Sequence, residues 1–297
     1  MSKDRGLDFP SIGFIGLGAL GLALAEKIDE KAGLTAVWNR SPGRYKSLSS
    51  DTISKTATIE DLCTQCRWVF CCVSDDKALS EVVHAVTSAT TKPTVFISLS
   101  SCTPGTVTEI EQALIENGIE FLNVPVLGKP EIVRAGMAGY LFSGQGQTRE
   151  DVLGLFDKLG GTVHDLGPDT PTSAAIKLSM NFLIASMITS FSEAFAQLGS
   201  ADIDPSQLLR VVENSPLGSP IAKMFGQAIL DQAFTPAQFD LTLACKDIRY
   251  FGTLTDDALG LFLYSAILRH MDLTFAMCRE PTDWSGLAGH LFRKHQG

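Results

Sequence analysis

A glycine-rich stretch near the start of the chain constrains the fold more than any other feature. Residues 11–25 read SIGFIGLGALGLALA, which sets glycines in the spacing G-x-G-x-x-G between an apolar run and a good helix former. A strand, a glycine turn and a helix in this order are typical of a dinucleotide-binding domain, and the apolar run at 35–38 suits the returning strand. The alternative is the plain strand–turn–helix of a flavodoxin-like domain.

Each glycine of the motif has a physical role. Gly16 permits a tight turn, Gly18 lets the backbone approach a diphosphate, and Gly21 lets the helix pack closely on the strand. The free N–H groups and the positive dipole end of the new helix face the phosphates. We therefore expect the turn to bind the cofactor through Gly16, Leu17, Gly18, Ala19, Leu20 and Gly21.

The residues after the second strand choose between NAD and NADP. An NAD site usually has Asp or Glu here for the ribose 2′-hydroxyl, whereas this chain has Asn39, Arg40, Ser41 and Arg44. A guanidinium matches a 2′-phosphate in a bidentate way, so we expect NADP(H), with Arg40 as the clamp and Asn39 and Ser41 as hydrogen-bond partners. The alternatives are that the arginines are surface charges and that Ser41, before Pro42, caps a helix.

Composition excludes several classes of function. The 297 residues carry a net charge of −9, which disfavours a nucleic-acid surface or an anionic membrane surface. The N-terminus has no apolar signal core and no run of 18 uncharged apolar residues occurs, so we expect a cytoplasmic protein without a membrane anchor. Cys63-x-x-Cys66 has no second ligand pair, and we expect no metal site and mostly core cysteines.

The chain changes character near Gly167, which predicts two domains. Alternating strands and helices in residues 1–167 predict an NADP-binding Rossmann domain with a doubly wound sheet. Residues 168–297 predict an all-α domain for substrate binding and dimerisation. The expected strands are 12–15, 35–38, 53–57, 68–73, 95–99, 120–124, 138–143 and 162–165, and the expected helices are 22–28, 42–49, one from 58, 77–87, 104–116, 149–159, 172–199, 204–214, 221–230, 239–255, 259–277 and 283–294.

The long helix at 172–199 is apolar on several faces. One monomer does not easily bury such a helix, so we expect a homodimer built on this interdomain helix. The alternative is burial within its own domain.

Polar side chains at the ends of the parallel strands are candidates for the site, because ligands of such sheets bind at the carboxyl ends. Val73 ends one of these strands and Ser74 follows it, and Ser100 and Ser101 follow another. On the interdomain helix, Lys177 and Asn181 are one turn apart and share a face. A lysine in a cleft can donate a proton to a carbonyl oxygen as hydride arrives, with its pKa tuned by burial; otherwise it extends to solvent.

The chain resembles the β-hydroxyacid dehydrogenase family, which includes 3-hydroxyisobutyrate dehydrogenases and tartronate semialdehyde and glyoxylate/succinic semialdehyde reductases, with imine reductases as relatives. Its first domain is similar to the NADP-binding domain of 6-phosphogluconate dehydrogenase. The resemblance covers nearly the whole chain. It rests on the segments GFIGLGALGLALA, WNRSPGR, SLSSCTP, NVPVLGKPEIVRAG, IKLSMNF and FDLTLACKDIRY. It implies a Rossmann domain, a helical domain, and dimers or tetramers.

By position, the resemblance makes Lys177 the catalytic lysine and Asn181 the substrate-holding asparagine one turn later. It places Ser101 near nicotinamide and substrate, and it brings Phe239 and Asp247 to the site, with Lys246 as a cofactor contact. The substrate loop corresponds to Val126, Leu127 and Gly128.

Three positions depart from the family pattern. Leu127 replaces the serine of D-x-P-V-S-G-G, so a substrate carboxylate loses an anchor and a less polar substrate becomes plausible. Pro171-Thr172-Ser173 replaces a G-x-G before the lysine, and Ser98 replaces a strand-end aspartate.

The sequence therefore predicts an NADPH-dependent oxidoreductase that transfers hydride between nicotinamide and the carbonyl of a small aldehyde or keto acid. Lys177 acts as the general acid, Asn181 and Ser101 orient the substrate, and Asp247 tunes the site. One alternative is an imine reductase on the same scaffold, although imine reductases commonly carry Asp or Tyr where this chain has lysine. Another is an NADP-binding sensor or scaffold without turnover.

Overall fold

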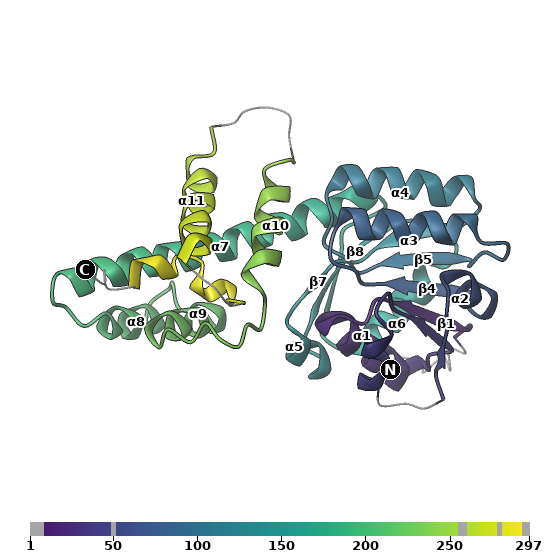
Figure 1. The fold of residues 1–297 in the computed structure, drawn as a ribbon, viewed down its shortest axis with the longest axis horizontal. Helices are drawn as coiled ribbons and strands as arrows, with labels where there is room; N and C mark the ends of the chain where they lie inside the picture. The colour runs from purple at the N-terminus through teal and green to yellow at the C-terminus, as the bar shows by residue number, and fades with distance from the viewer. Residues whose placement is uncertain (1–8, 49–51, 255–259, 278–280, 293–297) are drawn as a thin grey trace. The chain divides into compact units, whose positions relative to one another are not determined.

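A largely parallel sheet forms the first part of the computed structural model, which describes residues 9–48, 52–254, 260–277 and 281–292. Its strands are β1 (Ile12–Ile15), β2 (Ala36–Trp38), β3 (Ser54–Lys55), β4 (Trp68–Cys71), β5 (Val95–Ser98), β6 (Glu120–Asn123), β7 (Val126–Leu127), β8 (Gly139–Gly144) and β9 (Thr162–Asp165). The order is β3-β2-β1-β4-β5-β6-β8-β7, with β9 paired to β8 (Figure 1). Because the order reverses at β1, the sheet is doubly wound, which confirms the predicted Rossmann fold class.

Helices cover both faces of this sheet (Figure 1). α1 (Ala19–Ala32) and α6 (Arg149–Leu159) pack on one face, and α2 (Ile59–Gln65), α3 (Asp76–Ser88) and α4 (Pro104–Glu116) pack on the other. Every residue of β1, β4 and β5 is buried, as expected for parallel strands that are covered on both sides. The carboxyl ends of β1, β4, β5 and β6 meet at one edge.

Several expectations for this part of the chain were wrong. Residues 42–49 were expected to form a helix, but only a 3₁₀ segment, η1 (Pro42–Ser47), forms, and the Ser41 side chain does not cap it. No strand or helix was expected in residues 125–137, but they contain β7 and the short helix α5 (Pro130–Arg134). Elements this short carry too little periodicity to stand out from a loop, and β7 depends on pairing with the distant β8.

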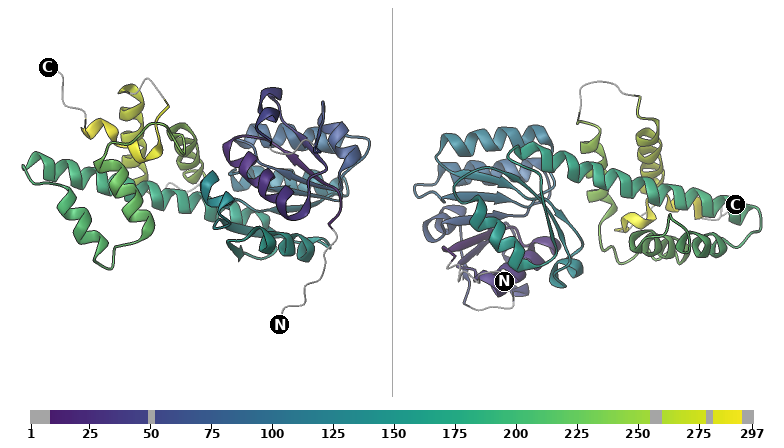
Figure 2. Two further views of the ribbon diagram at one scale, coloured as in Figure 1. Left: turned by 90° about the horizontal axis from the view of Figure 1, so that it is seen from below. Right: turned by 180° about the vertical axis from the view of Figure 1, so that it is seen from behind.

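The elements described in the rest of the chain are helical. α7 (Thr170–Ser200) is followed by α8 (Ser206–Glu213), α9 (Pro220–Leu230), α10 (Leu241–Phe251) and α11 (Phe262–Met277), with 3₁₀ segments η2 (Trp284–Gly286) and η3 (Gly289–Phe292). The chain divides into two compact units, Met1–Lys177 and Leu178–Gly297, so α7 contributes to both. In the second unit, α8 and α9 pack along one side of α7 (Figure 2).

Helix ends in the second unit differ from the expected ones. The helix expected at 239–255 begins only at Leu241, because the Asp240 side chain accepts a hydrogen bond from Thr242 N and so caps α10. The helix expected at 283–294 is instead η2 and η3, because the Asp283 carboxylate binds the amides of Gln238, Phe239 and Ser285. Residues 255, 259, 293 and 294, which the expected helices included, lie outside the described residues.

α7 is apolar over much of its surface, and only part of it is buried. Met180 and Leu183 are 36% and 59% exposed, whereas Ala185, Ile188 and Phe195 lie in the core of the second unit. By length and composition alone α7 could cross a membrane, a test that core helices of soluble proteins also pass, and 33% of its most apolar window is buried.

Candidate cofactor and active site

The turn between β1 and α1 requires glycine at two positions. Gly16 has a φ of +95°, and a Cβ there would collide with the Cys72 carbonyl oxygen. A Cβ at Gly21 would collide with the Gly16 carbonyl oxygen. These two contacts pack the turn against the end of β4 and the start of α1 against the turn.

Gly18 differs from the other two glycines, because a Cβ there would meet nothing within 4 Å. Gly18 is also the N-cap of α1, and no side chain caps this helix end. The amides of the first turn therefore face an open space beside a residue without a side chain. A diphosphate fits such a place, since its oxygens can accept from these amides and gain from the helix dipole.

Asn39 braces this turn from the end of β2. Its Oδ1 accepts a hydrogen bond from Leu17 N at 2.7 Å, and its Nδ2 donates to Ser41 O at 2.9 Å. The backbone N–H of Asn39 donates a hydrogen bond to the Tyr45 hydroxyl at 3.0 Å. Asn39, expected to bind the 2′-phosphate, thus joins the loop after β1 to the loop after β2.

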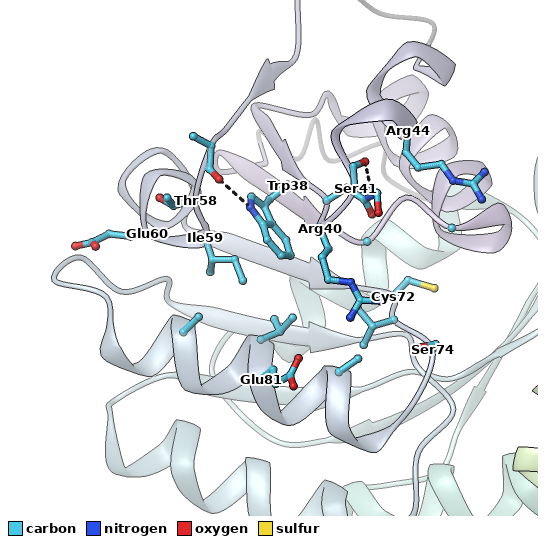
Figure 3. A pocket seen from close by; sticks show the side chains of 18 of the residues that line it. Trp38, Arg40, Ser41, Arg44, Thr58, Ile59, Glu60, Cys72, Ser74 and Glu81 are labelled. Carbon is cyan, nitrogen blue, oxygen red and sulfur yellow. Dashed lines mark hydrogen bonds between the residues drawn. The ribbon is translucent and has the colours of Figure 1, made fainter.

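A cavity of about 690 Å³ lies beside the turn, within the first unit. Trp38 and Ile59 form part of its apolar wall, and Arg40 reaches into it from the loop after β2 (Figure 3). Arg44 also lines the cavity, but its guanidinium points away from Arg40 (Figure 3). An apolar wall with a guanidinium beside it suits a planar base whose ribose carries a phosphate.

The cavity collects residues from several elements. Of the predicted cofactor residues, it brings together Gly16, Gly18, Asn39, Arg40, Ser41, Arg44, Val73 and Ser74. The other lining residues were not predicted from the sequence, and these are Trp38, Ala57, Thr58, Ile59, Glu60, Cys72, Ala78, Glu81, Val82, Ala85, Ser88 and Ala89. Trp38 and Cys72 stand at strand ends, a signal that could have identified them. The α2 and α3 residues depend on how these helices pack.

Ser100 links two strand ends rather than lining the cavity. Its Oγ accepts a hydrogen bond from Val73 N at 2.9 Å, which joins the loop after β4 to the loop after β5. Ser98, which stands where the family has aspartate, is fully buried. Ser101 follows in the same loop and is half-buried.

The predicted substrate loop also lies in the first unit. Val126 and Leu127 pair as β7 with Tyr140 and Gly139 of β8. Val126 is buried and Leu127 is half-buried, and Gly128 has a φ of +151°. The pairing holds the Leu127 backbone in a defined strand rather than in a free loop.

Lys177 is half-buried and ends the first unit. α7 continues unbroken through Lys177 to Asn181, so the two side chains share one face of the helix. In the second unit, Asn181 is 3% exposed, and its Nδ2 donates to Asp247 Oδ2 at 2.6 Å. Asp247 therefore fixes the orientation of the Asn181 amide.

Lys246 and Phe239 also have partners within the second unit. Lys246 Nζ forms an ion pair with Asp247 Oδ1 at 3.0 Å and lies 4.9 Å from the centre of the Tyr250 ring. Phe239 precedes α10 and packs its ring against Trp284, with the ring centres 5.0 Å apart. The expected cofactor contact of Lys246 and the expected substrate contact of Phe239 stay predictions.

The thiols of Cys63 and Cys66 are both buried. Burial raises the pKa of Cys63 to about 11, and burial with the neighbouring Cys63 raises the pKa of Cys66 to about 12. Both thiols are therefore protonated near neutral pH, and the thiolate is the form that binds metals. Among the described residues, no group of three His, Cys, Asp or Glu side chains is placed to hold a metal ion.

Comparison with known proteins gives matches along most of the chain. Residues 11–167 match a family model described as the NAD binding domain of 6-phosphogluconate dehydrogenase. Residues 172–277 match the NAD-binding domain of NADP-dependent 3-hydroxyisobutyrate dehydrogenase. These two matches confirm NADP(H) as the expected cofactor class.

Individual relatives are distant. An uncharacterized oxidoreductase of Bacillus subtilis, YfjR, is 26% identical over 80% of this chain and 83% of its own length. Human cytokine-like nuclear factor N-PAC is 27% identical over 82% of this chain, which spans only 44% of that protein. The solved structure of 3-hydroxyisobutyrate dehydrogenase from Salmonella typhimurium has a TM-score of 0.80 at 19% identity, covering 95% of this chain and 100% of that one.

The geometry of the turn predicts that Gly18→Ala separates binding from folding. The methyl group meets nothing in the protein, so the melting temperature should stay unchanged or rise slightly. The same methyl group occupies the space beside the α1 amides, so NADPH binding should weaken about tenfold, equivalent to about 1.4 kcal/mol. Fluorescence titration and thermal denaturation measure the two effects.

Gly16→Ala is the matched control, because its methyl group collides with the Cys72 carbonyl oxygen and its φ is positive. This variant should lose thermal stability. Unweakened NADPH binding by Gly18→Ala would contradict the placement of the diphosphate at this turn.

Proposed function

The chain belongs to the β-hydroxyacid dehydrogenase family of NADP-dependent oxidoreductases, and on that premise we propose that it reduces a carbonyl with NADPH. One observation carries the proposal: the first unit of the chain contains both the glycine-turn cavity, into which Arg40 extends, and Lys177. The first supplies a place for the cofactor, and the second supplies a proton donor.

Arg40 is proposed to select NADPH over NADH. Arg40 is exposed and extends into the cavity (Figure 3), and Asn39 stands at the strand-end position where an NAD site usually carries Asp or Glu. A bidentate contact between guanidinium and phosphate is stronger and more directional than a neutral hydrogen bond. Ser41 and Arg44 also line the cavity, although the Arg44 guanidinium points away from Arg40 (Figure 3).

Lys177 is proposed to exchange the proton that accompanies hydride transfer. Bound NADPH supplies the hydride to the carbonyl carbon, and the carbonyl oxygen then needs a proton. The Lys177 ammonium donates this proton in reduction, and the neutral amine accepts it in oxidation. Asn181, with its amide fixed by Asp247, and Ser101 orient the substrate.

Leu127 is proposed to shape the choice of substrate. Its half-buried side chain cannot donate a hydrogen bond to a carboxylate, and Val126 beside it is buried and apolar. A substrate that contacts Val126, Leu127 and Gly128 therefore gains from apolar groups rather than from a charge at this end. Small aldehydes with an apolar or uncharged substituent fit this requirement better than short hydroxy acids.

We also propose that the protein is a homodimer built on α7. Met180 and Leu183 expose large apolar side chains on this helix, and only part of its apolar window is buried within one chain. A second copy of the helix would remove this surface from water.

Lys177→Ala tests the proposed chemistry. Loss of the proton donor should lower kcat by about 10²-fold or more, the usual contribution of general acid catalysis, while NADPH affinity stays unchanged. The rate is measured as NADPH oxidation with glyoxylate, succinic semialdehyde or propanal. Lys223→Ala, which removes an exposed lysine paired with Glu213, is the matched control and should retain full activity.

Three results would contradict this assignment. Full turnover by Lys177→Ala would remove the lysine from the mechanism. Oxidation of NADPH only with a ketone and an amine together would indicate imine reduction. NADPH binding without turnover on any of these compounds would indicate a sensor or scaffold.

Arg40→Glu tests the selection of NADPH. A carboxylate repels the 2′-phosphate and can accept a hydrogen bond from the ribose hydroxyl, so preference should shift toward NADH by about tenfold or more. Competing kcat/KM values for NADPH and NADH measure this shift. Asn39→Ala is the comparison variant. It removes the hydrogen bond that Leu17 N donates to the Asn39 side chain, so the affinities for NADPH and for NADH should fall by the same factor. An unchanged preference in Arg40→Glu would show that another group binds the phosphate.

A further inference from the structure

A buried polar cluster joins the start of α7 to the sheet. Ser173, in the first turn of α7, is 0% exposed, as are Asn123 at the end of β6 and Ser143 in β8. Ser173 Oγ lies 3.0 Å from Asn123 Nδ2 and 2.6 Å from Ser143 Oγ. All three residues belong to the first unit, and Asn123 and Ser143 face each other in the antiparallel pairing of β6 with β8.

The hydroxyl of Ser173 uses its full hydrogen-bonding capacity. It accepts from Asn123 Nδ2 and from Ser143 Oγ, so its one proton is left for the carbonyl oxygen of Asn123 or of Thr170, each 3.2 Å away. Asn123 Nδ2 also donates to Thr170 O at 3.3 Å. Ser143 Oγ also lies 3.0 Å from Thr170 O and 3.3 Å from Asn123 O, so Ser173 and Ser143 share these two carbonyl acceptors and together form the centre of the cluster.

A second contact anchors the same turn from another element. The Thr170 hydroxyl donates to Glu111 Oε2 of α4 at 2.8 Å. The first turn of α7 is thus held from β6, β8 and α4. Side-chain hydrogen bonds to three different elements fix both the position and the rotation of a helix end, because hydrogen bonds are directional. Apolar contacts are not directional and fix the rotation less strictly.

This cluster is costly as a device for stability alone. The Asn123 side-chain oxygen is buried and accepts no hydrogen bond from any residue that the structure describes. A buried polar atom without a partner opposes folding, and apolar side chains of similar size would avoid that cost. Costly polar groups that persist in a core occur where a site needs a defined geometry.

The cluster stands between the two parts of the proposed site that lie in the first unit. Lys177 follows Ser173 by four residues, one turn later on the same face of α7. Val126 and Leu127 follow Asn123 by three and four residues, after the end of β6. A change in the bond between Ser173 and Asn123 would therefore shift the lysine relative to the substrate loop.

We propose that Ser173 is a positioning residue for Lys177, which it holds at a fixed place relative to the Val126–Gly128 segment by its bonds to Asn123 and Ser143. This inference rests on the proposed function, because it concerns the proton donor of that reaction. It accounts for the serine in the Pro171-Thr172-Ser173 segment, which stands where the family has G-x-G. Proton transfer depends steeply on such placement, since an error of about 1 Å can cost 10²-fold in rate.

Ser173→Ala tests the proposal in the full-length protein. The assay uses an aldehyde whose reduction is slowed by Lys177→Ala. With this substrate, Ser173→Ala should lower kcat about tenfold or more and leave the NADPH affinity unchanged. The solvent deuterium isotope effect on kcat should increase, because transfer of the proton becomes slower relative to the other steps. A merely structural role would lower the active fraction and leave the isotope effect unchanged.

Ser192→Ala is the matched control. Ser192 lies on the same helix and is 1% exposed, but its hydroxyl has no hydrogen-bond partner among the described residues. Its loss should leave kcat and the isotope effect unchanged. Ser143→Ala, which removes one of the two bonds that Ser173 accepts, is the second variant should Ser173→Ala not fold. Ser143→Ala should change both quantities in the same direction by a smaller factor.

The outcomes separate this inference from the proposed function. A normal kcat, or a lowered kcat with the isotope effect of the unaltered protein, would overturn the role of Ser173. Full turnover by Lys177→Ala would overturn the proposed function instead, whatever Ser173→Ala shows.

Discussion

The close packing of backbone on backbone at the first turn is the constraint on which the rest of the site depends. Carbonyl oxygens of Cys72 and Gly16 stand where side chains of residues 16 and 21 would be, so only glycine allows α1 to start at this distance from β1 and β4. The same packing leaves the face of Gly18 open. The amides of α1 thus meet the cavity without a side chain between them, as a bound diphosphate requires.

Side-chain hydrogen bonds of two residues, Asn39 and Ser100, connect the loops at the carboxyl edge of the sheet. Asn39 ties the loop after β1 to the loop after β2, so the position of Arg40, the next residue, depends on the glycine turn itself. Ser100 ties the loops after β4 and β5. Side chains at the carboxyl edge of the sheet are thus held by each other before any ligand is present, which reduces the ordering that binding requires.

The sequence predicted those parts of the site whose residues are close together in the chain. Gly16, Gly18 and Gly21 stand in one turn, and Arg40 lies two residues after the returning strand, so spacing and residue type were enough to select them as candidates. Ser143 and Ser173 contact Asn123 across 20 and 50 residues: the pairing of β6 with β8 brings Ser143 to Asn123, and the packing of the start of α7 brings Ser173 there. The walls of the cavity that come from α2 and α3 depend in the same way on how helices pack. The short β7 and α5 were missed because neither has enough residues to show a period.

Cofactor preference tests the central claim most directly, because it depends on the turn, the cavity and Arg40 together. The measurement is a fluorescence titration of the unaltered protein with NADPH and with NADH under one set of conditions. A guanidinium placed for the 2′-phosphate predicts that NADPH binds at least about tenfold more tightly, and more so at low salt than at high salt. Equal affinities, or tighter binding of NADH, would contradict the account.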